Sequence, residues 1–144
     1  MTIFEVIYDY FRESWKLIEG KSPDNPDLIV TGTGISRFDI PMLFVKSIIY
    51  NIDSHENLFD AYFKTKIVDL GDVGIPLFTK NPWPVLYPKP ANALAARLGI
   101  NVHKTSGKGV WDMYDAGDYE GIKQRTLEEL KTTVEIARKL TAWK

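Results

Sequence analysis

The residue best placed for chemistry is Asp39, which follows a glycine turn at the expected start of an apolar helix. The uninterrupted apolar run of residues 27–31 predicts a short buried strand, and Gly32 and Gly34 interrupt the chain after it. A carboxylate here can ligate a divalent metal, and two-metal phosphodiester hydrolysis needs several such carboxylates. Asp39 can also be an acidic helix-start residue, favoured by exposed N–H groups and the helix dipole. Both interpretations remain open from the spacing alone.

Hydrophobic periodicity predicts the elements that must position Asp39. The expected helices are residues 3–19, 38–50, 91–98 and 118–142, the last capped by Asp118. The expected strands are 27–31 and 66–70, with loops at 53–56 and 103–109 and irregular structure in the proline-rich stretch 74–90. The apolar face expected on the last helix comprises Ile122, Thr126, Leu130, Val134, Ala137 and Leu140. Short parallel strands joined by a helix predict an α/β fold, rich in helix with a small parallel sheet.

The composition fits a single domain spanning residues 1–144, with 44% hydrophobic residues to form a core. The net charge of −1 argues against a dedicated nucleic-acid binder, although it allows a local basic groove. The absence of cysteine excludes disulfides and thiolate chemistry. No apolar run approaches the roughly 18 residues of a membrane span, and the charged N-terminus is not typical of a signal peptide. We therefore expect a cytoplasmic protein without membrane contact.

Four segments, in this order, resemble motifs of a known enzyme family. They are Gly32-Thr-Gly-Ile-Ser-Arg-Phe-Asp-Ile-Pro-Met-Leu43, Ala91-Asn-Ala-Leu-Ala-Ala-Arg-Leu-Gly-Ile100, Val110-Trp-Asp-Met-Tyr-Asp-Ala-Gly-Asp-Tyr-Glu-Gly-Ile122 and Arg125-Thr-Leu-Glu-Glu-Leu-Lys-Thr-Thr-Val134. Together they are similar to the DEDD-group 3′–5′ exonuclease domains, and in particular to those related to the exonuclease domain of family B DNA polymerases. The resemblance covers roughly residues 3 to 140 and implies a ribonuclease-H-like fold.

The resemblance also implies roles for individual residues. Asp39 falls on the metal-binding aspartate of the second motif, and Gly34 falls where that motif usually has asparagine. Glu129 falls on the metal-binding aspartate of the third motif, and Arg125 falls where a tyrosine normally orients the attacking water. Asp39 and Glu129 are thus the implied catalytic and metal-binding residues, with Mg²⁺ or Mn²⁺ as the implied cofactor. The longer Glu129 side chain and the permanently protonated Arg125 both depart from the family pattern.

The first motif of the family, a β-hairpin carrying Asp-x-Glu, has no counterpart here, because Met1 falls nearly at the first helix. The fold is therefore expected to be truncated at its N-terminal hairpin, and the protein to be an exonuclease-like, catalytically impaired protein that acts on or binds nucleic acid. The strand 27–31 would keep an open edge. We expect either a homo-oligomer or a partner protein that completes the sheet. The alternative function is a non-catalytic structural or interaction subunit that uses this edge.

Single-stranded nucleic acid is the expected ligand, with DNA and RNA both open. The candidate contacts are Arg37, Lys104, Lys108 and Arg125, with Lys64 and Lys66 as further cations. The candidate stacking platforms are Phe78, Trp83, Tyr87 and Trp111, although aromatic residues among prolines more often cap the core of a long irregular loop. The segment His103–Gly109 is either a phosphate-contacting loop or a plain surface loop, and His55 lies in another expected loop.

Overall fold

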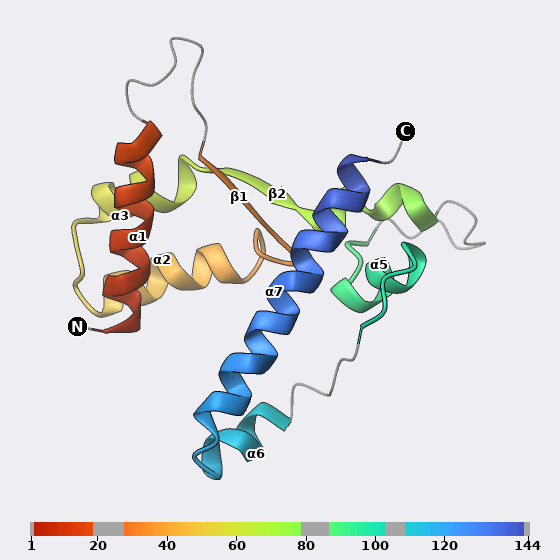
Figure 1. The fold of residues 1–144 in the computed structure, drawn as a ribbon. Coiled ribbons are helices and arrows are strands. Elements are labelled where there is room, and N and C mark those ends of the chain that lie inside the picture. The colour runs from red at the N-terminus through yellow and green to blue at the C-terminus, as the bar shows by residue number, and fades with distance from the viewer. Residues whose placement is uncertain (1, 19–27, 79–86, 103–108, 143–144) are drawn as a thin grey trace. The chain divides into compact units, whose positions relative to one another are not determined.

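The computed structural model describes residues 2–18, 28–78, 87–102 and 109–142 (Figure 1). It is a mixed α/β structure, rich in helix. The elements in chain order are α1 (Ile3–Ile18), β1 (Ile29–Gly32), α2 (Asp39–Ile49), α3 (His55–Phe63), β2 (Lys66–Asp69), α4 (Leu70–Val73), the 3₁₀ helix η1 (Ile75–Phe78), α5 (Ala91–Arg97), α6 (Gly109–Asp115) and α7 (Tyr119–Thr141). Contacts group the chain into two compact units, residues 1–69 and residues 70–144. The expectation of one domain over residues 1–144 stays a prediction.

The sheet consists of β1 and β2, which run parallel in a register from Ile29 opposite Lys66 to Gly32 opposite Asp69. The backbone N–H of Lys66 donates to the carbonyl oxygen of Leu28 over 2.8 Å. Helices α2 and α3 form the connection between the two strands, as Figure 1 shows. The predicted small parallel sheet is confirmed, and both strands end at the same edge, next to the turn that leads to α2.

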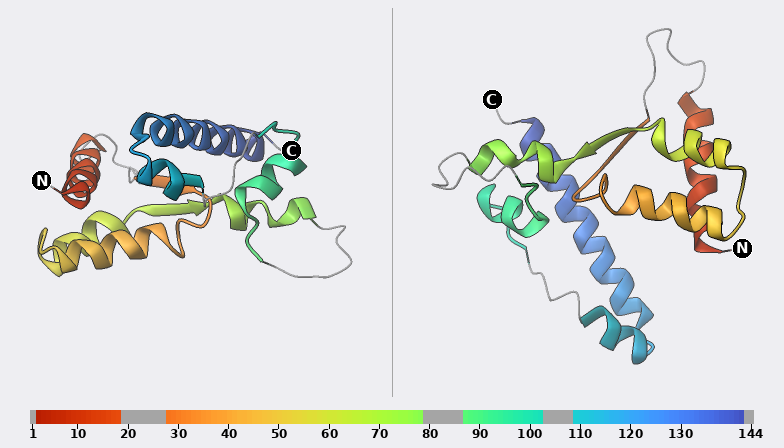
Figure 2. Two further views of the ribbon diagram at one scale, coloured as in Figure 1. Left: turned by 90° about the horizontal axis from the view of Figure 1, so that it is seen from below. Right: turned by 180° about the vertical axis from the view of Figure 1, so that it is seen from behind.

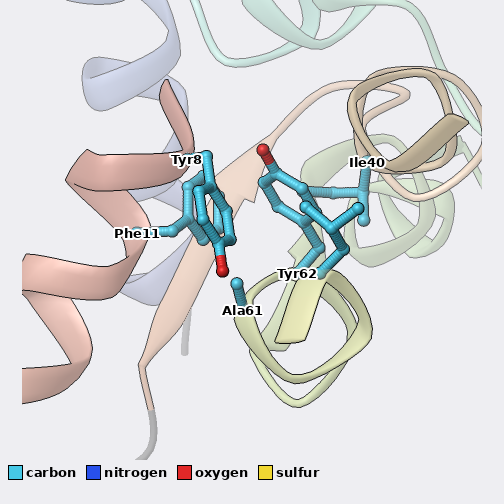
Figure 3. Packing of buried hydrophobic residues seen from close by; sticks show 6 residues of the cluster. Tyr8, Phe11, Ile40, Ala61 and Tyr62 are labelled. Atoms are coloured by element: carbon cyan, nitrogen blue, oxygen red, sulfur yellow. The ribbon is translucent and has the colours of Figure 1, made fainter. Parts of the chain in front are cut away.

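The core of the first unit lies between α1, α2 and α3 (Figure 3). Its buried members are Tyr8, Phe11, Ile40, Leu58, Ala61 and Tyr62. The ring of Phe11 meets that of Tyr62 edge-on at a centroid distance of 5.0 Å. The indole N–H of Trp15 donates to the carbonyl oxygen of Ala61 over 3.1 Å. The apolar spacing that predicted the first helix therefore buries one face of α1 against α3.

Helix α3 was not expected, because residues 53–56 were predicted to be a loop. Only Asp53 and Ser54 precede the helix, which begins at His55. Ser54 is its N-cap and accepts a hydrogen bond from the N–H of Asn57 over 3.2 Å. A capping serine followed by Leu58, which is fully buried, is the sequence signal that the loop prediction overlooked.

Asp53 links this helix start to α1. Its carboxylate accepts hydrogen bonds from the Tyr8 hydroxyl at 2.6 Å, from the Ser54 N–H at 2.7 Å and from the Asn57 side-chain amide at 2.8 Å. The guanidinium of Arg12 lies over the Tyr8 ring, 5.6 Å from its centroid. The first turn of α3 and the middle of α1 are therefore joined by one carboxylate.

The second unit builds its own core from α4, η1, α5 and the C-terminal end of α7 (Figure 2). The buried residues are Leu70, Leu77, Leu94, Ala95, Ile100 and Ile136. Arg97 Nε donates to the carbonyl oxygen of Leu77 over 2.9 Å, and Lys139 Nζ donates to that of Leu98 over 2.9 Å. These bonds tie both flanks of α5 to their neighbours.

The expected apolar face of α7 is wrong in part. Ala137 and Leu140 pack against the core, but Leu130 and Val134 are exposed, and the buried residue of the helix is Ile136. The physical reason is that the core of this unit meets α7 at Ile136, Ala137 and Leu140, near the C-terminal end of the helix. Asp118 does cap α7, as predicted, by accepting from the N–H of Gly121 over 2.9 Å.

Two further segments differ from expectation. Within the proline-rich stretch 74–90, residues 75–78 form η1, residues 87–90 are irregular as expected, and residues 79–86 lie outside the described residues. Gly109 was placed in a loop, whereas it begins α6, a helix that the sequence analysis did not predict. No helix of the described segments is long and apolar enough to cross a membrane.

The Tyr8–Asp53 hydrogen bond makes stability depend on pH. Donation from Tyr8, then from Asn57 and Ser54, lowers the pKa of the Asp53 carboxyl below its ordinary value. A lowered pKa in the folded state adds stability above the unfolded pKa of about 3.9, and this stability is lost as pH falls through the folded pKa. Tyr8→Phe should therefore lower the free energy of unfolding by about 1–2 kcal/mol at neutral pH. The difference from wild type should shrink at an acidic pH, below the unfolded pKa of about 3.9.

Urea unfolding followed by circular dichroism at both pH values measures this. Tyr10→Phe is the matched control, since Tyr10 is exposed on the same helix, and its free energy of unfolding should stay within about 0.5 kcal/mol of wild type. A loss in Tyr8→Phe that is equal at both pH values would rule out the link to Asp53.

Candidate functional site

The turn between β1 and α2 has a backbone that glycine makes possible. Gly34 has φ of +79°, in the left-handed region that residues other than glycine and asparagine seldom adopt. A Cβ on Gly32 would lie 2.5 Å from Cγ2 of Ile35, so a side chain at this position would force Ile35 to shift. The N–H groups of Arg37 and Phe38 both donate to the carbonyl oxygen of Gly34, at 3.2 and 3.1 Å. The turn therefore leads directly from the strand end into the first turn of α2.

Asp69, the last residue of β2, holds this turn in place. Its carboxylate accepts from the Gly34 N–H at 2.9 Å, the Ser36 N–H at 3.3 Å and the Ser36 hydroxyl at 2.9 Å. Asp69 is only 4% exposed, so these donors replace the hydrogen bonds that its carboxylate would make to water. Asp69 was not among the site residues predicted from the sequence. The available signal was an acidic residue near the end of the predicted strand 66–70, at the sheet edge where the glycine turn must also lie.

Asp39 is the first residue of α2 and is partly buried. Among the described residues its side chain makes no hydrogen bond or ion pair, and Phe38, the N-cap of α2, supplies no side-chain cap. The fold therefore uses the carboxylate of Asp69 and leaves that of Asp39 to the dipole of α2 and to solvent. Both interpretations of Asp39, as metal ligand and as helix-start residue, stay compatible with this position.

Glu129 and Arg125 lie one turn apart on α7 and form an ion pair. Arg125 Nη2 is 3.4 Å from Glu129 Oε1, and the side chains are 13% and 49% exposed. Of the predicted site residues, these two are brought together. Asp39 belongs to the first unit and Glu129 to the second, so a metal shared by them stays a prediction. Within residues 2–18, 28–78, 87–102 and 109–142, no group of three histidine, aspartate or glutamate side chains could hold a metal ion.

The remaining candidates are dispersed. Arg37 is exposed in the turn, two residues before Asp39, whereas Lys104 and Lys108 lie outside the described residues. Lys64 forms an ion pair with Asp60 at 2.7 Å on the surface of α3, and Lys66 begins β2.

The candidate stacking aromatics differ in their surroundings. Phe78 packs against the core of the second unit, which agrees with the core-capping interpretation, and Lys89 Nζ lies 5.1 Å from the centroid of its ring. Tyr87 and Trp111 are exposed, and Trp83 lies outside the described residues. His55, expected in a loop, is exposed in the first turn of α3.

The contrast between the two aspartates of the turn predicts a contrast in stability. Asp69→Asn replaces one acceptor oxygen by a donor that faces N–H groups, so the free energy of unfolding should fall by about 2 kcal/mol. Asp39→Asn removes no bond and should change it by less than about 0.5 kcal/mol. Urea unfolding of both variants measures the difference. Equal losses in the two would show that the turn does not depend on Asp69.

The chain matches no protein-family model, no curated protein and no solved structure.

Proposed function

We propose that this protein binds single-stranded nucleic acid as a relative of the DEDD-group 3′–5′ exonucleases, with a ribonuclease-H-like fold, and that it cleaves its ligand poorly. The observation that carries the proposal is the position of Asp39. It begins a helix directly after a parallel strand and a glycine turn, and its carboxylate has no hydrogen-bond partner among the described residues. A carboxylate that the fold does not use, at the carboxyl edge of parallel strands, is available to a ligand.

The backbone of Gly34 supports the same relationship. The resemblance places an asparagine at this position, and the residue has φ of +79°. Glycine and asparagine are the two residues that adopt this conformation most readily, so one can replace the other without rebuilding the turn. The exchange removes the asparagine side chain while keeping the path of the chain into α2.

Arg37 supplies the positive charge for a nucleic-acid ligand in this region. It is exposed in the turn just before Asp39. The protein carries a net charge of −1, so attraction to phosphates has to be local rather than spread over the surface. A guanidinium stays protonated and can contact a phosphate oxygen with two N–H groups.

The proposal of poor cleavage rests on α7. Glu129 stands where the resemblance places a metal-binding aspartate, and its carboxylate pairs with Arg125 at 3.4 Å. Arg125 stands where the family uses a tyrosine hydroxyl, and a guanidinium has no acceptor for a proton of water. Cleavage would need ligand geometry within about 0.5 Å, which a side chain longer by one methylene does not reproduce.

Fluorescence anisotropy with a labelled oligothymidylate of about 20 nucleotides tests the binding. Arg37→Ala should weaken binding about threefold to tenfold and reduce the slope of log affinity against log salt by about 1. With Mn²⁺ or Mg²⁺ added, a 5′-labelled oligonucleotide should be shortened no faster by wild type than by Asp39→Ala.

The matched control is Lys16→Ala, since Lys16 is exposed on α1 and pairs with Glu13 at 2.6 Å. Its affinity should stay within about twofold of wild type. Absence of binding by wild type would refute the proposed function. Metal-dependent shortening that Asp39→Ala abolishes would instead identify an active two-metal exonuclease.

The edge of β1 favours a second candidate function, that of an interaction subunit. In the described part of the chain, β1 has β2 as its single neighbour. Because Lys66 bonds to Leu28, the alternation of a parallel ladder turns the backbone groups of Ile29 and Thr31 toward the other side. Ile29 is exposed, so an apolar strand edge is open to a second copy of the chain or to a partner protein.

Light scattering after size-exclusion chromatography tests this candidate. Wild type should elute with the mass of two chains or more. Ile29→Pro should shift the measured mass toward that of one chain. Proline removes an N–H group from the open edge at the first residue of the strand. Ile29→Thr keeps the N–H and should behave as wild type. A wild type that is monomeric at high concentration would exclude self-pairing along β1.

A further inference from the structure

Helix α6 is unusual in the second unit because it buries no residue. It lies beside the N-terminal end of α7, as Figure 1 shows. Its side chains Trp111 and Tyr114 are 71% and 57% exposed, and Tyr119 at the start of α7 is 63% exposed. Three large aromatic side chains on one short stretch would ordinarily be placed in a core or in an interface.

The three rings belong to one surface. Trp111 and Tyr114 are three residues apart on α6 and therefore lie on the same side of the helix. The rings of Tyr114 and Tyr119 meet edge-on at a centroid distance of 6.0 Å. We call this surface, formed by Trp111, Tyr114 and Tyr119, the aromatic corner.

Among the described residues, the charge around the aromatic corner is negative. The acidic residues of the segment are Asp112, Asp115, Asp118 and Glu120. Lys123 offsets one of them through its ion pair with Glu120 at 3.3 Å, and Asp118 caps α7. Asp112 and Asp115 form no ion pair with any cation that the structure describes, and both are exposed. Aromatic faces between uncompensated carboxylates attract cations and repel phosphate.

We propose that the aromatic corner docks an arginine-bearing cationic segment of a partner protein. A guanidinium can stack on the face of Trp111 or Tyr114 while it donates to a neighbouring carboxylate. A second copy of the chain fits less well, because a two-fold interface would place Asp112 and Asp115 against themselves. Nucleic acid fits least, because its phosphates would meet the same carboxylates. Trp111, Tyr114 and Tyr119 take no part in the proposed function.

Fluorescence anisotropy with a fluorescein-labelled hexa-arginine peptide tests the proposal on the full chain. Trp111→Ala should weaken binding at least about fivefold, because it removes the largest exposed ring. The double variant Asp112→Asn with Asp115→Asn should weaken it to a similar extent and reduce its dependence on salt. Hexa-lysine should bind more weakly than hexa-arginine, because an ammonium group lacks the planar face of a guanidinium.

The matched control is Tyr10→Ala, since Tyr10 is 73% exposed on α1 and lies next to Asp9. It should bind hexa-arginine as wild type does. All these side chains are exposed, so circular dichroism should show that each variant is folded. The proposal fails if wild type does not bind the peptide, or if Tyr10→Ala loses as much affinity as Trp111→Ala.

Two other outcomes would overturn the proposal in favour of another occupant. Loss of oligothymidylate binding in Trp111→Ala would make the aromatic corner a nucleic-acid surface. Loss of a dimer in Trp111→Ala, seen by light scattering, would make it a contact between copies of this chain. Retention of oligothymidylate binding in Trp111→Ala, together with weaker hexa-arginine binding, supports the proposal whether or not Arg37 contacts nucleic acid.

Discussion

The first unit depends on the hydrogen bonds that the Asp69 carboxylate accepts from the turn after β1. Asp69 ends one strand and accepts from the N–H groups of Gly34 and Ser36, which belong to the turn after the other strand. Two parallel strands of four residues each provide few ladder bonds, so this cross-link fixes how the chain leaves the sheet. The direction of α2, and with it the position of Asp39, follows from that exit. These N–H groups of the glycine turn therefore donate to a side chain of the protein itself rather than to a ligand.

Six aspartates of this protein fall into two groups, according to whether their carboxylates accept hydrogen bonds from the backbone. Asp53, Asp69 and Asp118 each accept hydrogen bonds from backbone N–H groups, and each holds the start of a helix or the end of a strand. Asp39 makes no such bond, and neither do the carboxylates of Asp112 and Asp115 within the segments that the structure covers. A side chain that stability does not require is the more informative about function. Asp39 and the pair on α6 are the carboxylates on which the two ligand proposals rest.

Local patterns in the sequence predicted much of the fold. Apolar spacing located α1, α2, α5 and α7, and short β-branched runs located both strands to within one or two residues. Helix α3 was missed because its polar start, Asp53 to Glu56, resembles a loop until the cap at Ser54 is recognised. Helix α6 was missed because it has no buried face for periodicity to report.

The site was harder to predict than the elements. Asp39 was found because it lies next to the turn in sequence. Asp69 was not, because its bond to Gly34 spans 35 residues and no local pattern records it. The apolar face of α7 was misassigned for the same reason, since the neighbours of a helix decide which of its apolar residues are buried.

The lack of burial on α6 has a consequence for how a partner would engage it. A helix that contributes nothing to a core gains little free energy from folding. The entropy that is lost when the helix becomes ordered is therefore offset only in part until a partner binds. Much of the free energy of contact would go into holding the segment in its helical form, and little would remain as affinity. A complex of low affinity dissociates quickly, because differences in affinity lie mostly in the dissociation rate, and this suits a partner that is exchanged rather than one that is retained.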